Sequence, residues 1–273
     1  MNRTRTLVMA GAVATALVLP LGPANAGSSQ PHSDGHAVGL VGGDKLVAFD
    51  LTRPGKPKAV GKVSGLSGDT ELVGIDFRVQ NKLLYAVGDA GGIYTLSSKA
   101  KATKVSQLTV ALSGSTFGVD FNPAADRLRV VSDTGQNLRH DVNPGGATLT
   151  DGTLTYPPAT TPAAGISAAA YTNNDLDADT ATTLFDLDTA MDQVAIQAPA
   201  NAGSLSPTGK LGTDVGSDAG FDIGGADNHG WATLSVGGKF RLYSVSLLTG
   251  EARSKGSFPS SLQVSDIALP IGH

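Results

Sequence analysis

The 273-residue chain has no cysteine, only two glutamates and, after its first 26 residues, no long apolar run. The lack of cysteine excludes disulfides, thiol catalysis and thiolate metal sites. A domain without disulfides must rest on its hydrophobic core, and a chain of this length suffices for one large domain. The acids are 22 aspartates against two glutamates. Aspartate favours turns whereas glutamate favours helices, so this imbalance predicts a turn-rich, all-β protein.

Residues 1–26 have the pattern of a signal peptide. Arg3 and Arg5 give a positive start, Leu7 to Leu19 is an apolar stretch of 13 residues, and residues 24–26 fit a small-x-small cleavage motif. The apolar stretch is shorter than the roughly 20 residues that span a bilayer. We therefore expect cleavage near Ala26 and an exported protein, extracellular or in the cell envelope, without a membrane span.

The expected mature chain consists of a short arm and one domain, and its negative net charge excludes some classes of partner. A polar arm covers residues 27–36, and one domain covers residues 37–273. The leader holds two of the 20 basic residues, so its removal leaves 18 against 24 acidic ones and moves the formal net charge from −4 to −6. An acidic chain has no electrostatic reason to bind nucleic acid or an anionic membrane. We expect a monomer.

A short strand motif recurs along the chain. Its clearest copy is GVDF at residues 118–121, and weaker copies are GIDF at 74–77, AAAY at 168–171, GFDI at 220–223 and VSDI at 264–267. The third residues of these copies are separated by 44, 50, 52 and 44 positions. Each complete unit holds four short runs with strand composition, joined by turn residues. A period of about 40 to 50 residues with four strands per unit is typical of a β-propeller.

Five copies of the motif predict five blades. The chain begins with the later strands of a blade and ends with a lone first strand from Val264 to Leu269, so the two ends are expected to pair in one sheet and close the ring. A six-bladed ring, with one degenerate blade in the interval from Gln197 to Gly220, is the main alternative. A β-sandwich is the third possible fold.

The repeat also carries a resemblance to a known family. The strand GVDF with the following Asn-Pro, the segment RVVSDTGQNLR at 129–139, AAAYTN at 168–173 and AGFDI at 219–223 resemble a bacterial exported family described only as a domain of unknown function. The likeness extends over about residues 39–271. It implies a propeller-like fold and bacterial export, but no activity.

The aspartates of the repeated strand are the first candidate site. The inner strands of a propeller line its channel, so an acidic ring would bind a hard cation such as Ca²⁺ through oxygen. The structural interpretation, which we favour, is that each carboxylate accepts backbone N–H groups of the next blade. The residues concerned are Asp76, Asp120, Asp222 and Asp266; the corresponding position in the remaining copy is Ala170.

The second candidate is the most polar blade. Three of the seven arginines that follow the leader fall within 13 residues there, beside two amides. Paired guanidinium groups suit a carboxylate, phosphate or sulfate, and amides suit sugar hydroxyls. An ion-pair network between blades is the structural alternative. The predicted ligand-binding residues are Arg127, Arg129, Asp133, Gln136, Asn137 and Arg139.

The sequence contains no catalytic motif, and we name no catalytic residue. The favoured hypothesis is a binding module for a small anionic or sugar-like molecule, a glycan or a surface protein. The alternatives are a hydrolase of polysaccharide or lactone with Asp120 or Asp222 as acid or base, and a structural cell-surface module. An enzyme needs a carboxyl group with a raised pKa, whereas a structural ring is expected to hold lowered ones.

Overall fold

A computed structural model of the chain describes residues 35–177, 179–225 and 227–271. The described residues form one compact unit of five four-stranded antiparallel sheets. The predicted signal peptide, residues 1–26, and most of the predicted arm lie outside the described residues. No helix among the described residues is long and apolar enough to cross a membrane.

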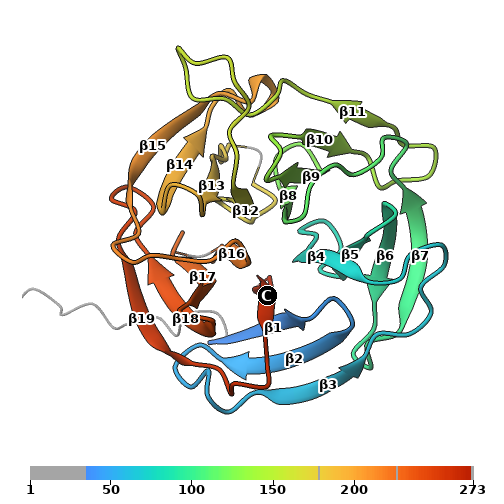
Figure 1. Ribbon diagram of the computed structural model, residues 1–273. Coiled ribbons are helices and arrows are strands. Elements are labelled where there is room, and N and C mark those ends of the chain that lie inside the picture. The colour runs from blue at the N-terminus through green and yellow to red at the C-terminus, as the bar shows by residue number, and fades with distance from the viewer. Residues whose placement is uncertain (1–34, 178, 226, 272–273) are drawn as a thin grey trace, which may run out of the picture. The chain divides into compact units, whose positions relative to one another are not determined.

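The five sheets are the blades of a propeller and are arranged as a ring (Figure 1). We call the region around the ring axis, which the inner strands face, the channel. In each of blades II to V the four strands follow one another in sequence from the channel to the rim. Blade II holds β4 (Leu72–Phe77), β5 (Leu84–Gly88), β6 (Gly92–Leu96) and β7 (Ala102–Gln107); blade III holds β8 (Phe117–Asn122), β9 (Arg127–Ser132), β10 (Asn137–His140) and β11 (Thr148–Thr150). Blade IV holds β12 (Ile166–Tyr171), β13 (Leu184–Asp188), β14 (Gln193–Gln197) and β15 (Leu205–Lys210); blade V holds β16 (Ala219–Ile223), β17 (Gly230–Val236), β18 (Lys239–Val245) and β19 (Ala252–Ser257).

Blade I is assembled from both ends of the chain. Its inner strand is β20 (Val264–Ala268), and β1 (His36–Val41), β2 (Lys45–Asp50) and β3 (Lys58–Lys62) complete it. β1 and β20 pair antiparallel, with Leu40 opposite Asp266. The predicted closure of the ring is thus confirmed, and five blades replace the six-bladed alternative: the interval from Gln197 to Gly220 holds only the short 3₁₀ helix η1 (Ala200–Ala202) and β15.

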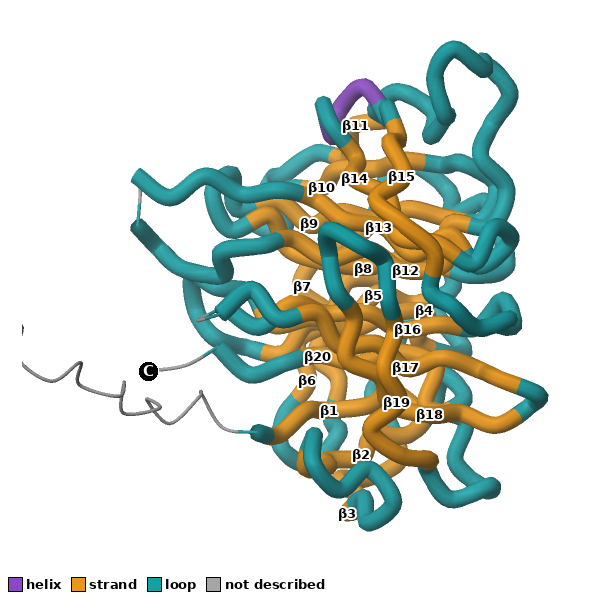
Figure 2. The backbone as a smooth tube through the Cα atoms, turned by 90° about the vertical axis from the view of Figure 1, so that its left-hand side faces the viewer, coloured by secondary structure: helices purple, strands orange, loops and turns teal. Residues whose placement is uncertain are grey.

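Apolar residues of adjacent blades pack against each other and form the core. One cluster joins Phe185 and Leu187 of blade IV to Phe221 and Leu234 of blade V. Turns and loops gather at the two ends of the strands, seen from the side in Figure 2, so the ring has two loop-bearing faces. Loops are freer to vary than the strands that position them, so binding residues are expected on these faces.

Glycine in the repeated strand motif lets neighbouring inner strands approach closely. A Cβ atom at Gly118 would lie 2.5 Å from the backbone nitrogen of Ala169 in the next blade, and one at Gly220 would lie 2.4 Å from Cα of Asp266. Backbone atoms cannot move aside like a flexible side chain. The motif therefore combines a glycine for close approach with an aspartate two residues later.

Replacing Gly118 with alanine is expected to destabilise the protein by about 2 kcal/mol, because overpacking forces the two strands apart. The melting temperature should fall by roughly 4–8 °C in a domain of this size. Thermal unfolding followed by circular dichroism measures this. Gly55→Ala is the control, since a Cβ there meets nothing closer than 3.4 Å; equal melting temperatures for the two variants would contradict the packing argument.

Candidate functional site

The four aspartates of the inner strands tie neighbouring blades together around the channel. Oδ2 of Asp266 accepts the N–H of Ile75 at 2.8 Å, and Oδ2 of Asp76 accepts that of Phe121 at 2.8 Å. All four side chains are buried, with at most 7 % exposed. Each bond joins the inner strand of one blade to the backbone of the next.

The remaining two aspartates continue the same pattern. Oδ1 of Asp120 accepts the N–H of Tyr171 at 3.1 Å, and Oδ2 of Asp222 accepts that of Leu269 at 2.5 Å. Four of the five junctions between inner strands therefore carry a carboxylate bridge. The fifth, between blades IV and V, has Ala170 at the corresponding place.

Burial raises the pKa of all four carboxyl groups. It raises the pKa of Asp222 to about 7. For Asp76, burial acts first and the charge of Asp222 adds to it; for Asp120, the charges of Asp76 and Asp222 add to burial. The pKa of Asp266 is raised mainly by burial as well. We expected lowered values in a structural ring, and the opposite direction arises because desolvation outweighs the backbone hydrogen bonds.

A cation could be held where three of these carboxylates converge. One oxygen each of Asp76, Asp120 and Asp222 lies within 4.8 Å of the others, and two oxygens bound to the same Ca²⁺ ion at about 2.3–2.6 Å can be that far apart. However, both oxygens of Asp76 and of Asp222 already accept backbone N–H groups. The donor set fits a cation in charge, but it offers few free lone pairs for the six to eight ligands that Ca²⁺ takes.

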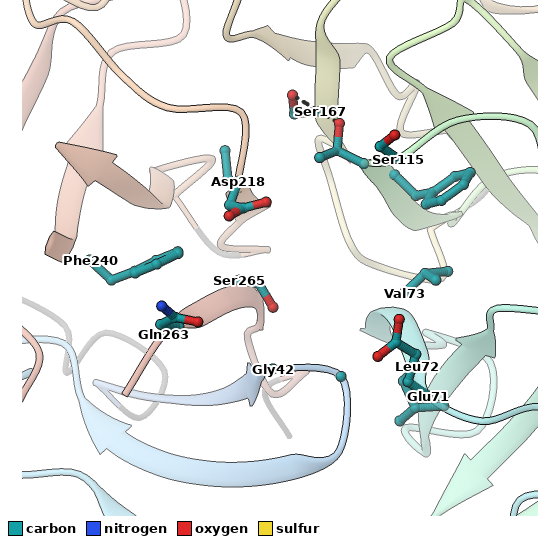
Figure 3. A pocket seen from close by; sticks show the side chains of 14 residues that line it. Gly42, Glu71, Leu72, Val73, Ser115, Ser167, Asp218, Phe240, Gln263 and Ser265 are labelled. Atoms are coloured by element: carbon teal, nitrogen blue, oxygen red, sulfur yellow. Dashed lines mark hydrogen bonds between the residues drawn. The ribbon is translucent and has the colours of Figure 1, made fainter. Parts of the chain in front are cut away.

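A cavity of about 270 Å³ opens at the face where the inner strands begin. We call it the mouth cavity. Every blade contributes to its wall, and Figure 3 shows Glu71 of blade II and Asp218 of blade V on opposite sides of it. Residues that line it are Gly42, Gly43, Glu71, Leu72, Val73, Ser115, Thr116, Phe117, Ser167, Asp218, Ala219, Phe240, Gln263 and Ser265.

The mouth cavity combines hydrogen-bonding groups with two aromatic rings. Glu71 and Asp218 bring carboxylates, Gln263 brings an amide, and four serine or threonine residues bring hydroxyls. Phe117 and Phe240 bring the rings. None of the residues that line the cavity in the described part of the chain is basic. The charged residues of the lining, Glu71 and Asp218, are both acidic, so the electrostatic field here disfavours an anion.

None of the six predicted ligand-binding residues lines the mouth cavity, but two support its wall. Oδ1 of Asp133 accepts the N–H of Ser115 at 2.8 Å, and Oε1 of Gln136 accepts that of Ser113 at 3.0 Å. Nε2 of Gln136 donates to the carbonyl of Ala111 at 2.8 Å. These bonds hold the loop that leads into β8, where Ser115 reaches the cavity.

Arg129 is the centre of a buried network between blades III and IV. Its side chain is 2 % exposed. Nη1 donates to Asn137 and to Asp151, each at 2.7 Å, and Nη2 donates to Asn201 at 2.8 Å. Nε donates to the hydroxyl of Tyr171 at 3.2 Å. Each nitrogen of the guanidinium group thus donates a hydrogen bond to another side chain of the protein.

Arg139 and Arg127 are paired as well. Arg139 donates to both carboxylate oxygens of Asp151, at 2.9 and 3.0 Å, so it joins the network of Arg129. Arg127 forms a separate ion pair with Asp141 at 3.0 Å. The structure therefore brings together Arg129, Asn137 and Arg139, and keeps Arg127 apart from them.

Sequence reasoning missed Glu71, Asp218 and Gln263. Each lies immediately before an inner strand, but three, two and one positions before the respective copy of the repeated motif, so alignment of the copies does not bring them together. The dense polar cluster of blade III marks a network between blades rather than a cavity.

Comparisons with known proteins give one family match and several similar solved structures. A family model described as a domain of unknown function (DUF4394) matches residues 45–268, and curated proteins gave no match. Similar solved structures include a nidogen/laminin complex, at a TM-score of 0.48 and 11% identity over 86% of this chain and 80% of that chain. A Bacteroides thetaiotaomicron protein of unknown function has a TM-score of 0.49 and 12% identity over 81% of this chain and 55% of that chain. An auxiliary nutrient binding protein of the same organism has a TM-score of 0.46 and 11% identity over 81% and 54%. The chain spans just over half the length of the two Bacteroides proteins.

Proposed function

The chain belongs to the DUF4394 family, a domain of unknown function, and we propose that it is an exported binding module that holds a neutral, sugar-like molecule in the mouth cavity. The observation that carries this proposal is the composition of that cavity: carboxylates, an amide and hydroxyls around two aromatic rings, without a basic side chain among its lining residues. Carboxylates and amides accept hydrogen bonds from sugar hydroxyls, and aromatic rings pack against the apolar face of a sugar.

The size of the cavity supports a small ligand. Its volume of about 270 Å³ is close to the lower end of the roughly 300–1,000 Å³ found for ligand pockets. A small sugar suits this volume better than a large ligand does, and a longer glycan would continue into solvent. An anionic ligand draws no support from this wall, because Glu71 and Asp218 would repel it.

The second candidate function is hydrolysis of a polysaccharide or lactone. The raised pKa of Asp222, about 7, is the property expected of a general acid. Access argues against it, since Asp222 is 2 % exposed and Asp120 is 1 % exposed, and both accept backbone N–H groups. Neither lines the mouth cavity. Binding without catalysis is therefore the better supported function.

The test is a thermal-shift and calorimetric screen of the mature chain with neutral mono- and oligosaccharides, and with sulfate and citrate as anions. A ligand bound only by the native state raises the melting temperature. We expect a neutral sugar to do so and the anions not to. Asp218→Ala should weaken sugar binding about tenfold or more, the effect of losing a hydrogen bond to a charged group.

Asp214→Ala is the matched control, because Asp214 is exposed and lies outside the cavity. It should bind the sugar as the unaltered protein does. A shift with the anions alone, or a sugar shift that survives in Asp218→Ala, would contradict the proposal.

A further inference from the structure

A second cavity, of about 360 Å³, lies at the opposite face, between blades I and V. We call it the seam cavity, because it adjoins the blade that both chain ends build. Its wall comes from the ends of β16 and β20 and the starts of β1 and β17. The lining residues include Leu51, Asp227, His229, Trp231, Lys255 and Leu269.

The seam cavity has an apolar side and a cationic side. Leu51, Leu269 and Pro270 provide aliphatic surface, beside the single tryptophan of the chain, Trp231. The Nζ atom of Lys255 lies 5.8 Å from the centroid of the Trp231 ring. The His229 ring lies 5.0 Å from the same ring at an interplanar angle of 53°. Tryptophan, imidazole and ammonium groups therefore meet at one wall.

Lys255 brings a charge that the described part of the protein does not neutralise. No carboxylate of the described residues lies within ion-pair distance of its Nζ atom, whereas the nearby Arg253 pairs with both oxygens of Glu251, each at 3.0 Å. The one acid in the wall, Asp227, accepts the backbone N–H of His229 at 3.1 Å. An ammonium group held against an aromatic ring beside a cavity is a donor placed for an incoming anion.

We propose that the seam cavity binds a small carboxylate that carries an apolar body. The carboxylate receives hydrogen bonds from Lys255 and from the imidazole of His229. The apolar body packs against Trp231, Leu51 and Leu269, where its burial is favourable. This ligand differs in charge and in location from the sugar of the mouth cavity, and neither proposal rests on the other.

The single tryptophan makes the test specific to this cavity. Trp231 is the only indole in the chain, so a change in its emission reports on the seam cavity and not on the mouth cavity. The mature chain is titrated with cyclohexanecarboxylate, and its neutral amide serves as the matched ligand without charge. We expect a saturable change in emission with the carboxylate and binding at least about tenfold weaker with the amide, because a charge-assisted hydrogen bond is lost.

Lys255→Met keeps the aliphatic stem and removes the charge, and should weaken carboxylate binding about tenfold or more. Its melting temperature should not change, since Lys255 is exposed. Lys58→Met removes an equal charge from an exposed site outside both cavities and should bind as the unaltered protein does. Equal affinities for the carboxylate and the amide, unchanged binding in Lys255→Met, or no saturable change in emission would each overturn the proposal.

Discussion

Arg129→Met is expected to lower the free energy of unfolding by about 3–5 kcal/mol, the cost of breaking a buried ion pair by removing one partner. The guanidinium group donates to Asp151 and to oxygens of Asn137, Asn201 and Tyr171. Methionine fills much of the same volume but donates to none of them, so polar groups stay buried without a partner. The melting temperature should fall by roughly 6–20 °C. Urea unfolding followed by circular dichroism measures the difference in free energy.

Arg253→Met is the matched control. Arg253 also forms a bidentate pair, with Glu251, but the two side chains are 72% and 55% exposed. An exposed ion pair contributes about 1 kcal/mol or less, so this variant should unfold almost as the unaltered protein does. Equal losses in the two variants would show that burial of Arg129 does not set its contribution.

The arginines also distinguish a structural network from a ligand site. Arg139 is 30% exposed and shares Asp151 with Arg129. If the network only joins blades III and IV, Arg139→Met should reduce stability and leave the binding of every ligand unchanged. A loss of anion binding in folded Arg139→Met protein would instead support the site that the sequence predicted there.

The fold was predictable because its determinant repeats. The spacing of Asp76, Asp120, Asp222 and Asp266 marks the inner strands of four of the five blades, and the glycine two positions before the first three marks a close approach between strands. Both features act on the neighbouring blade, so they recur in most blades. The lone first strand at the C-terminal end predicted the closure of the ring, because it needs the later strands at the N-terminal end to complete a blade.

The candidate site was less predictable because its residues share no motif. Glu71, Asp218 and Gln263 are distant in the chain and meet only where loops of different blades converge. The partners of Arg129 are equally distant: Asn201 lies 72 residues away. Sequence could show that the arginines were dense, but not that their donors were already engaged. That depends on how two blades pack.

The predicted direction of the pKa shifts in the ring was wrong for a related reason. We expected a structural ring to hold carboxylates with lowered pKa values, because backbone N–H groups stabilise the charged form. Sequence shows the donors but not the depth of burial. At 1–7 % exposure, desolvation and repulsion within the ring dominate.

These raised pKa values predict that the ring contributes most to stability in mild acid. Burial raises the pKa of Asp222 from 3.8 to about 7. Between these values the folded state binds more protons than the unfolded state, so stability falls as the pH rises from about 4 through about 7. At about 1.4 kcal/mol per pKa unit, the contribution of Asp222 alone is on the order of 4 kcal/mol. Urea unfolding at pH 5 and pH 8 measures the total change.

The pKa values of some other groups are lowered, so their effect on the pH dependence of stability must be separated from that of the ring. The lowered pKa of Asp50, about 2, acts only below pH 4. Burial lowers the pKa of His140, so this residue adds stability as the pH rises toward 6.5 and opposes the ring. A variant of the ring itself removes this ambiguity, since His140 contributes equally to both proteins.

Asp120→Asn is that variant, because Oδ1 of Asp120 accepts the N–H of Tyr171 and the asparagine oxygen can take its place. Burial raises the pKa of Asp120, so the free-energy cost of its buried charge grows as the pH rises, whereas asparagine stays neutral; the stability of the variant relative to the unaltered protein should therefore increase from pH 5 to pH 8. At pH 8 the variant should be the more stable by about 1–3 kcal/mol, since it avoids a buried charge. A variant that is less stable than the unaltered protein at pH 8 would contradict the prediction.

Asp76→Asn is the informative contrast. Both oxygens of Asp76 accept backbone N–H groups, at 2.6 and 2.8 Å, so an amide nitrogen there would face a donor and leave it unsatisfied. This variant should lose about 1–3 kcal/mol of unfolding free energy at pH 5.

Repeating both pH series with Ca²⁺ and with EDTA tests whether the ring binds a cation. A cation at Asp76, Asp120 and Asp222 would keep them ionised, so Ca²⁺ would raise stability at pH 8 in the unaltered protein and much less in Asp120→Asn. If neither Ca²⁺ nor EDTA changes the stability at either pH, protonation rather than a cation neutralises the carboxylates, and the aspartates act as bridges between blades.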